Sequence, residues 1–421
     1  MSQYAGSTRA IDDLDRWIRG EFTELNTELE ELYFADRAIA DPDRPEVKAL
    51  TDVLVRAGGA LVANVAETRE LPADEDTRYE LLGMVGFYLG ACRRHEVRAD
   101  PEHYAALAVA LSTSLGVAPR FASAHQHMHN RAVGGAFNTF TKLDSERIFL
   151  TYNGLAVMAY RRAAHALQSV PALGVSNPLA TYHLTDAVAA LQDVLTYSQK
   201  LAADLDPDRF FYNIRPYFKS YRVGSKEYRG ANAGDFAAIN VIDVLLGLCS
   251  PHDPFYQWVT TDKYPYVTPR DQQVLRSLVG TESLLCQLVR ELEIGTPSVA
   301  LRENAELLLA ACQRHGAATV YHHQKLVIPF LQEPAAHAPE ERQSDMTASG
   351  PPLDVVIASL ARLRDLRAAR NRPDLVTARS DLDRVRLLLA DRREPTSWPE
   401  TPESLEQTFF SCAPKRRRPK G

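Results

Sequence analysis

The stretch AACQRHGAATVYHHQKLVIPFL, residues 310–331, has helical spacing and carries three histidines. We expect a helix to start at Pro297, because proline tolerates the first position of a helix. We expect Pro329 to end it, because proline removes a backbone donor from a helix interior. The sequence therefore predicts a long helix over about residues 297–327.

Within this helix, His322 and His323 cannot face the same target, since successive helical residues point about 100° apart. Thr319, Gly316 and Cys312 share the face of His323 at offsets of four, seven and eleven residues. Small residues beside one imidazole let a flat macrocycle approach the helix, and neutral histidine is a standard haem ligand. A core histidine bonded to a backbone carbonyl fits the same pattern, so the helix alone leaves both interpretations open.

Helical periodicity dominates the rest of the chain, which predicts an all-α fold. A chain of 421 residues is long enough to form a core that encloses a cofactor. Further helices are expected over about residues 9–38, 45–68, 77–94, 101–115, 145–167, 179–205, 237–248, 269–293, 353–369 and 373–392.

The expected organisation is an N-terminal helical extension over residues 1–75, followed by a main domain over residues 76–394. The main domain is expected to have a small part, about 76–142, and a large helical part, about 143–394. Residues 395–421 are rich in proline and basic residues and are expected to form a disordered tail. Such a tail resembles a nucleic-acid-binding patch, although a solvated chain end explains it as well.

Composition places the chain among globular proteins, with 45% hydrophobic and 24% charged residues. The net charge of −6 does not favour broad nucleic-acid binding. No apolar run approaches the length of about 18 residues that a membrane helix needs, and the N-terminus lacks the apolar segment of a secretory signal. The five cysteines are scattered, which argues against a zinc site or a disulfide framework. These features predict a cytoplasmic protein.

Three alternating histidines, His125, His127 and His129, form a second candidate site. They share one face on a strand, whereas on a helix His125 and His129 pair at a spacing of four. Either arrangement suits zinc, copper or non-haem iron. The nearest carboxylates that follow, Asp144 and Glu146, lie well downstream. A polar loop, or a role for one histidine beside a cofactor, therefore stays open.

Residues 210–234 interleave aromatic rings with arginines and glycines and have no clean period. Rings supply walls for a planar ligand and arginine forks bind carboxylates. Nucleic-acid stacking uses the same mixture, and a packed aromatic loop with surface arginines explains it equally. Residues 347–350, Thr-Ala-Ser-Gly, indicate by themselves only a flexible turn.

The run FFYNIRPYFKSYRVGSKEYRGANAGDFAAINVIDVLLG, residues 210–247, resembles the matching region of indoleamine 2,3-dioxygenases. In those enzymes two phenylalanines precede an arginine, then a loop of small residues and an Asp-Val-Leu-Leu-Gly sequence. The counterparts here are Phe210, Phe211 and Arg215, followed by residues 232–234 and 243–247.

Other segments are similar to the monodechloroaminopyrrolnitrin synthase family of the same superfamily. They are residues 85–90 with the nearby Arg94-His95 pair, residues 221–224 and residues 264–267. The family's proximal histidine is followed by a Leu-Lys-Leu or Leu-Gln-Ile type of sequence. Residues 323–327 fit this pattern, which selects His323 over His322. The resemblance covers about residues 76–352.

The resemblance implies a helical domain that clasps haem b, with a smaller N-terminal part closing the distal side and His323 as the iron ligand. For substrate contacts, it implies Phe149, Tyr152, Phe210, Phe211, Arg215, Arg222 and Ser349. For contacts with the cofactor, the resemblance and the small-residue helix face together imply Gly316, Asn232, Ala233, Gly234, Thr347 and Gly350.

Two positions depart from the dioxygenase pattern. Tyr152 stands where those enzymes carry a serine, and Val320 stands where an arginine often meets a haem propionate; Arg222 is the candidate to replace that arginine. The expected activity is a haem-dependent oxygenase or peroxygenase that uses dioxygen or hydrogen peroxide on a tryptophan-like amino acid in specialised metabolism. No side chain is expected to act as acid or base, and the protein is expected to be a monomer or homodimer. Haem binding without turnover, and a non-haem metal site on the three alternating histidines, remain alternatives.

Overall fold

The computed structural model describes residues 2–35, 43–97, 102–336 and 352–390, and the chain in these ranges is almost entirely helical. The predicted all-α fold is confirmed. The predicted contacts of Thr347, Ser349 and Gly350, and the predicted tail, lie outside the described residues.

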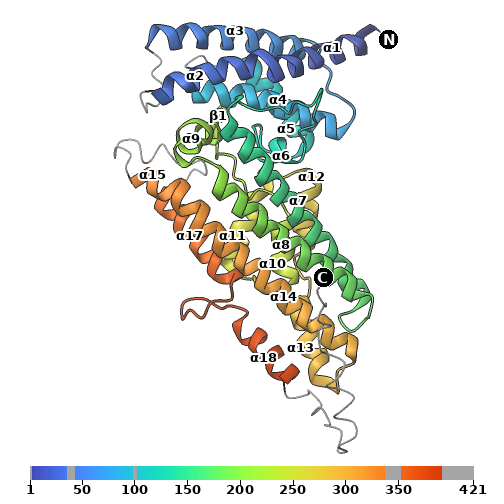
Figure 1. The fold of residues 1–421 in the computed structure, drawn as a ribbon. Coiled ribbons are helices and arrows are strands. Elements are labelled where there is room, and N and C mark those ends of the chain that lie inside the picture. The colour runs from blue at the N-terminus through green and yellow to red at the C-terminus, as the bar shows by residue number, and fades with distance from the viewer. Residues whose placement is uncertain (1, 36–42, 98–101, 337–351, 391–421) are drawn as a thin grey trace, which may run out of the picture.

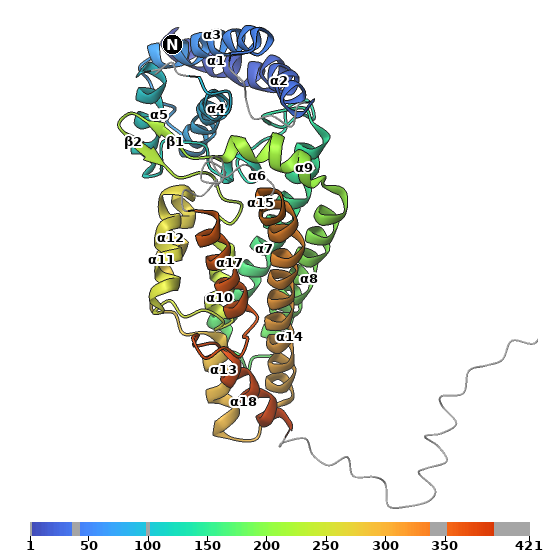
Figure 2. The ribbon, with the colours of Figure 1, turned by 90° about the vertical axis from the view of Figure 1, so that its left-hand side faces the viewer.

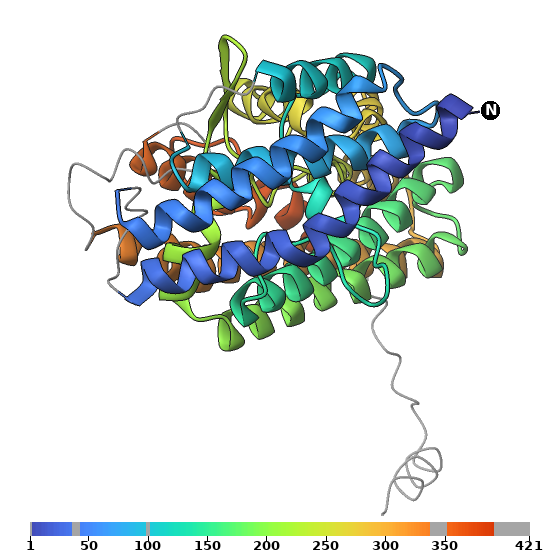
Figure 3. The same cartoon turned by 90° about the horizontal axis from the view of Figure 1, so that it is seen from above.

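The N-terminal part holds six helices and the irregular segment that follows them. The helices are α1 (Ser2–Trp17), α2 (Thr23–Ala35), α3 (Pro45–Glu67), α4 (Glu75–Arg94), α5 (Glu102–Leu115) and α6 (Ala124–His127). A π-helical turn, Ile18–Phe22, joins α1 to α2. Figure 1 shows α1, α2 and α3 lying across one end of the molecule, and Figure 3 shows them from above.

The remaining helices form an elongated bundle below that layer (Figure 1). They are α7 (Asp144–Leu173), α8 (Ala180–Asp204), α9 (Pro207–Arg209), α10 (Ala238–Leu245), α11 (Pro254–Lys263), α12 (Pro269–Ser277), α13 (Leu284–Ile294), α14 (Val299–His322), α15 (Glu333–Ala336), α17 (Leu353–Arg367) and α18 (Arg379–Ala390). Helices α7, α8 and α14 run side by side and make the most extensive packing in the described chain.

Between α9 and α10 the chain is irregular, as the absence of a clean period predicted. It forms a π-helical segment, η2 (Phe210–Ile214), and a 3-10 helix, η3 (Arg215–Phe218). A two-stranded antiparallel sheet follows, made of β1 (Tyr221–Val223) and β2 (Lys226–Tyr228).

Apolar side chains gather in two large clusters, one at each end of the molecule. Trp17, Phe22, Phe87 and Phe140 belong to the N-terminal cluster, which joins α1–α5 to α7, α8 and the irregular segment. The second cluster fills the bundle between α7, α8, α10, α13 and α14. The first 75 residues thus share a core with the residues that follow, and the proposed domain boundaries stay a prediction.

The helix predicted over 297–327 begins at Val299 and is capped by Ser298, whose hydroxyl oxygen accepts a hydrogen bond from the backbone N–H of Leu301. The expectation that Pro329 ends the helix is wrong. The chain winds on as a π-helical segment, η5 (His323–Gln332), which passes through Pro329, since a proline removes one hydrogen bond without always terminating a helix.

Two further differences concern residues 254–294. Helix α11 was not expected, and the single helix expected over 269–293 is two helices, α12 and α13. Gly280 lies between them with φ +85°, a conformation that breaks a right-handed helix.

Among the described residues, α3 alone has the length and composition of a membrane span. The expectation that no apolar run has the length of a membrane helix is therefore not met. The face of α3 that carries Val47, Leu54 and Val62 is buried in the N-terminal cluster, and a core helix of this composition passes the same test, so the feature is weak evidence for a membrane.

Candidate functional site

A cavity of about 700 Å³ lies where the N-terminal part meets the long bundle. This volume is typical of pockets that hold cofactors and small ligands. Its walls come from α7, α8, α11, the α14–η5 junction, α17, η2, η3 and the loops before α7 and α10. The cavity therefore collects residues from most of the segments that the sequence singled out.

His323 lines the cavity but is packed beneath α17. Its side chain is only 6% exposed, and its Nδ1 lies 3.4 Å from Nη1 of Arg364 on α17. Its Nε2 is buried and hydrogen bonds to no group among the described residues. Burial, and then the guanidinium of Arg364, lower the pKa of His323, which favours the neutral ring.

His322 also lines the cavity, and its imidazole is open. More than a third of its surface is accessible, yet burial lowers its pKa to about 4, with smaller contributions from Arg367 and His323. Part of the His322 ring is accessible, yet protein surrounds the ring closely enough to lower its pKa. The accessible part therefore faces the cavity and not bulk water. The structure therefore presents two candidate imidazoles, and the accessible ring of His322 argues against our selection of His323.

The loop after α5 and helix α7 form another wall of the cavity. His127 accepts a hydrogen bond at Nε2 from the Asn153 amide nitrogen at 2.7 Å, and its ring meets Phe149 edge-on. Burial lowers the pKa of His127 to about 4. Phe149 and Tyr152 line this wall as predicted, and so does Phe210 from η2. The cavity thus has a neutral imidazole and three aromatic rings along this wall.

Arg215 places a buried positive charge on the cavity. Its side chain is 8% exposed, and no described residue forms a hydrogen bond or ion pair with it. Burial lowers its pKa to about 10, so it stays protonated at neutral pH. A buried guanidinium without a counter-ion is costly and is suited to bind an anion.

Three predicted contacts are not at the cavity. Phe211 turns away from it and packs against Ala335. Arg222 is exposed on β1, because alternate side chains of a strand point to opposite faces and its neighbours point inward. Gly316 faces α17: a Cβ on it would approach Cα of Ala368 at 3.1 Å, so the small residue serves helix packing.

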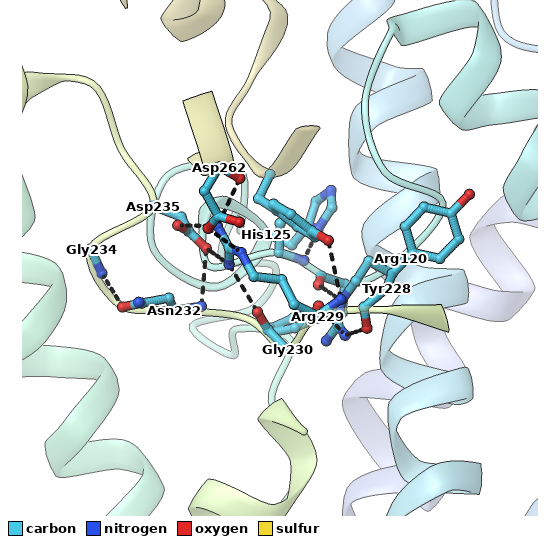
Figure 4. Close-up of polar contacts among 12 residues, drawn as sticks. Arg120, His125, Tyr228, Arg229, Gly230, Asn232, Gly234, Asp235 and Asp262 are labelled. Atoms are coloured by element: carbon cyan, nitrogen blue, oxygen red, sulfur yellow. Dashed lines mark hydrogen bonds and ion pairs between the residues drawn. The ribbon is translucent and has the colours of Figure 1, made fainter. Parts of the chain in front are cut away.

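Asn232, Ala233 and Gly234 line the cavity as predicted, in a loop held by ion pairs (Figure 4). Arg229 contacts Asp235 at 2.9 Å and Asp262 of α11 at 2.7 Å. These ion pairs attach the loop to α11 and leave its backbone along the cavity wall.

The alternating histidines do not form a metal site. His125 accepts a hydrogen bond at Nδ1 from the Ala122 N–H at 2.9 Å, whereas His129 lies 3.9 Å from Asp76. His127 alone lines the cavity. Within the described ranges no three histidine, cysteine or carboxylate side chains converge on one point, so the structure gives no support to the non-haem alternative.

Sequence reasoning missed two cations at the cavity, Arg367 and Lys263. Arg367 contacts Asp243 at 2.8 Å, and Lys263 donates to Asn240 Oδ1 at 2.9 Å. No local motif marks either residue. The signal in the sequence was Asp243, the first residue of the Asp-Val-Leu-Leu-Gly segment on which the resemblance rests, because Asp243 is the ion-pair partner of Arg367.

Comparisons with known proteins bear on the family and the fold. A family model for monodechloroaminopyrrolnitrin synthase PrnB matches residues 8–389. The match runs well beyond residues 76–352, so the expectation that the first 70 residues lie outside the resemblance is wrong. The myoglobin of Haliotis madaka is 25% identical over 161 residues, which are 34% of this chain. The chain spans 42% of the length of that myoglobin. Both matches fit a helical haem-type fold.

Proposed function

Because the chain belongs to the monodechloroaminopyrrolnitrin synthase family, whose members are haem-dependent oxygenases, we propose that it binds haem b and oxidises a tryptophan-like amino acid. The observation that supports this most is the cavity of about 700 Å³. It is lined by an open, neutral imidazole and by a buried guanidinium that contacts the ring of Phe211 but no carboxylate among the described residues.

We propose His322 as the iron ligand. Its ring is accessible from the cavity, and its pKa of about 4 leaves the imidazole neutral, as a metal ligand requires. His323 remains the competing ligand, because its buried Nε2 also lacks a protein partner. A guanidinium lowers the pKa of each ring, Arg364 for His323 and Arg367 for His322, so the accessibility of the His322 ring is what favours it.

The donor set fits haem in three respects. The imidazole is neutral, several aromatic rings line the cavity, and positive charge is available for acidic groups through Arg215. Bound haem would supply the redox chemistry with dioxygen or hydrogen peroxide. The protein would supply binding, orientation and exclusion of water.

Arg215 is proposed to bind the carboxylate of the amino acid, because a guanidinium pairs with a carboxylate through two parallel hydrogen bonds. Phe149, Tyr152 and Phe210 line the cavity and supply flat surfaces for an aromatic side chain. His127 is held by Asn153 and stays neutral at physiological pH, so it presents a polar but uncharged group to the same space.

The test is an absorption spectrum of the full chain titrated with haemin, for the wild type and for His322→Ala and His323→Ala. We expect His322→Ala to lose the histidine-ligated Soret band and His323→Ala to keep it. His165→Ala is the matched control, because His165 is exposed on α7 and away from the cavity. Unchanged spectra for both variants would contradict a ligand from this pair, and loss only in His323→Ala would restore our first selection.

Haem binding without turnover is a second candidate, favoured by the similarity to a myoglobin. Consumption of dioxygen or peroxide by the haem-loaded chain, with and without tryptophan, separates the two. Substrate-dependent consumption supports the oxygenase, and its absence across tryptophan, tyrosine and their halogenated relatives supports the binding protein.

A further inference from the structure

A hydrogen-bonded network lies behind the cavity wall formed by α11 and α17, with Asp243 of α10 at its centre. The carboxylate accepts hydrogen bonds from His315 Nε2 at 2.7 Å, Arg367 Nη2 at 2.8 Å and the Tyr256 hydroxyl at 2.8 Å. All of these groups are buried. Asp243 is therefore fully committed to partners within the network.

The network continues to Lys263 through two neutral groups. The Tyr256 hydroxyl accepts from the Asn240 amide nitrogen at 3.0 Å, and Asn240 Oδ1 accepts from Lys263 Nζ at 2.9 Å. The hydrogen-bonded chain thus contains one carboxylate, Asp243, and two cations, Arg367 and Lys263. Among these three charged groups the cations outnumber the carboxylates by one.

Lys263 and Arg367 both line the cavity, while Asp243 does not. Lys263 is only 9% exposed. The neighbouring carboxylates, Asp235 and Asp262, are engaged by Arg229 (Figure 4). Among the described residues, the ammonium of Lys263 makes a single hydrogen bond, so two of its three donors remain for a ligand.

We propose that Lys263 is a second carboxylate-binding residue of this cavity, distinct from Arg215 and supported from behind by Asn240. Figure 2 shows α11, which ends at Lys263, on one side of α17, and α9, which leads toward Arg215, on the other. The inference rests on the proposed function for the identity of the carboxylate. That group is either a propionate of the porphyrin or the carboxylate of the amino acid, and both have the same chemistry.

The energetics of an unneutralised buried amine support this assignment. Burial lowers the pKa of Lys263 to about 8, so desolvation penalises its charged form. A bound carboxylate offsets that penalty and completes the hydrogen bonds of the ammonium. A lysine that only supported Asn240 would gain nothing from any acidic ligand.

The experiment measures the affinity of the full chain for four probes: haemin, haemin dimethyl ester, tryptophan and tryptamine. The ester masks the propionates, and tryptamine lacks the carboxylate. The variants are Lys263→Met and Lys263→Arg, with Lys200→Met as control because Lys200 is exposed at the end of α8. Haemin affinity is measured on the chain without haem, and tryptophan affinity on the haem-loaded chain.

We expect Lys263→Met to weaken binding of one carboxylate-bearing probe by about tenfold to a hundredfold, the effect of losing a hydrogen bond to a charged group. We expect Lys263→Arg to restore part of the lost affinity. The affinity for the matching probe without a free carboxylate, haemin dimethyl ester or tryptamine, should not change. Loss for haemin but not its ester assigns a propionate, and loss for tryptophan but not tryptamine assigns the amino acid.

Equal affinities of Lys263→Met and wild type for all four probes would overturn the inference, and so would equal losses for masked and unmasked probes. Failure of the proposed function is a different result. In that case the wild-type chain itself shows no histidine-ligated Soret band with haemin.

Discussion

Replacing Lys263 by methionine is expected to stabilise the chain without haem at neutral pH, although it weakens ligand binding. Burial holds the pKa of Lys263 at about 8, against 10.5 for an ordinary lysine. That difference of about 2.5 pKa units corresponds to about 3 kcal/mol of folding free energy, lost by keeping the buried amine protonated. Asn240 loses its partner in the variant, which costs about 1 kcal/mol, so we expect a net gain of about 2 kcal/mol at pH 7.

The sign of the pH dependence follows from a folded-state pKa that is lower than the unfolded-state pKa. Below about pH 8 both states carry the proton, and the folded state bears the whole penalty. Between about pH 8 and pH 10.5 the folded state releases its proton first, so the wild type gains stability relative to the variant. By pH 10 the remaining penalty is under about 1 kcal/mol.

Other charges around Lys263 do not reverse this expectation. Asp235 and Asp243 raise its pKa, whereas Arg367 and Arg229 lower it, and all of these effects are smaller than that of burial. The carboxylates and guanidiniums stay ionised from pH 7 to pH 10, so the change in the stability difference over this range belongs to Lys263.

The assay is urea unfolding of the wild type and of Lys263→Met, both without haem, at pH 7, 8, 9 and 10. Lys200→Met is the control and should follow the wild type, because that side chain is exposed. The reasoning is refuted if the stability difference between wild type and Lys263→Met stays constant over this range, or if the methionine variant is the less stable protein at pH 7.

Three further predictions concern other parts of the chain. Arg215→Gln should weaken tryptophan binding by about tenfold or more, as loss of a charged hydrogen bond does, while Arg222→Gln should leave it unchanged in the same spectral titration, because Arg222 is exposed on β1. Glu30→Gln should lower the free energy of unfolding by about 3 kcal/mol or more. The buried guanidinium of Arg94 lies 2.6 Å from the Glu30 carboxylate and loses its counter-ion in this variant. A Glu30→Gln variant that unfolds like the wild type would contradict this. Gly86→Ala should cost about 1–3 kcal/mol in the same unfolding assay, because its Cβ would lie 2.6 Å from a backbone nitrogen of the loop after α5, and an unchanged midpoint would show that this loop yields freely.

The helices were predictable because their information is local. Apolar spacing and start signals located α3, α5, α8 and α17 to within a few residues of their bounds. The break at Gly280 was missed, because a glycine in a helical pattern breaks it only when the chain adopts a positive φ. Packing of α12 and α13 around that residue is a tertiary effect.

The choice between His322 and His323 shows where local pattern stops. Periodicity states that the two rings point about 100° apart, but it does not say which faces the interior. The face of Gly316 was predicted to accommodate a macrocycle, and in the structure α17 covers it. A neighbouring helix can approach small residues as closely as a macrocycle can, so the small residues alone did not show which of the two packs against this face.

Lys263 and Arg367 were beyond prediction for a different reason. Lys263 is held by Asn240, which lies 23 residues away in the chain. Arg367 is held by Asp243, which lies 124 residues away. Burial of a lysine is rare enough that a sequence reading places it at the surface. The fold alone brings these residues to one wall.

Two buried cations without a carboxylate of their own, Arg215 and Lys263, border one cavity of the described chain. Each lowers the stability of the protein without a ligand, because burial disfavours the charged form. A chain that stabilised its own fold would place apolar residues at both positions. A ligand set with two acidic groups, such as two porphyrin propionates or one propionate and an amino acid, offsets both costs at once. The same charges that destabilise the empty cavity therefore favour occupancy by an acidic ligand over a neutral one.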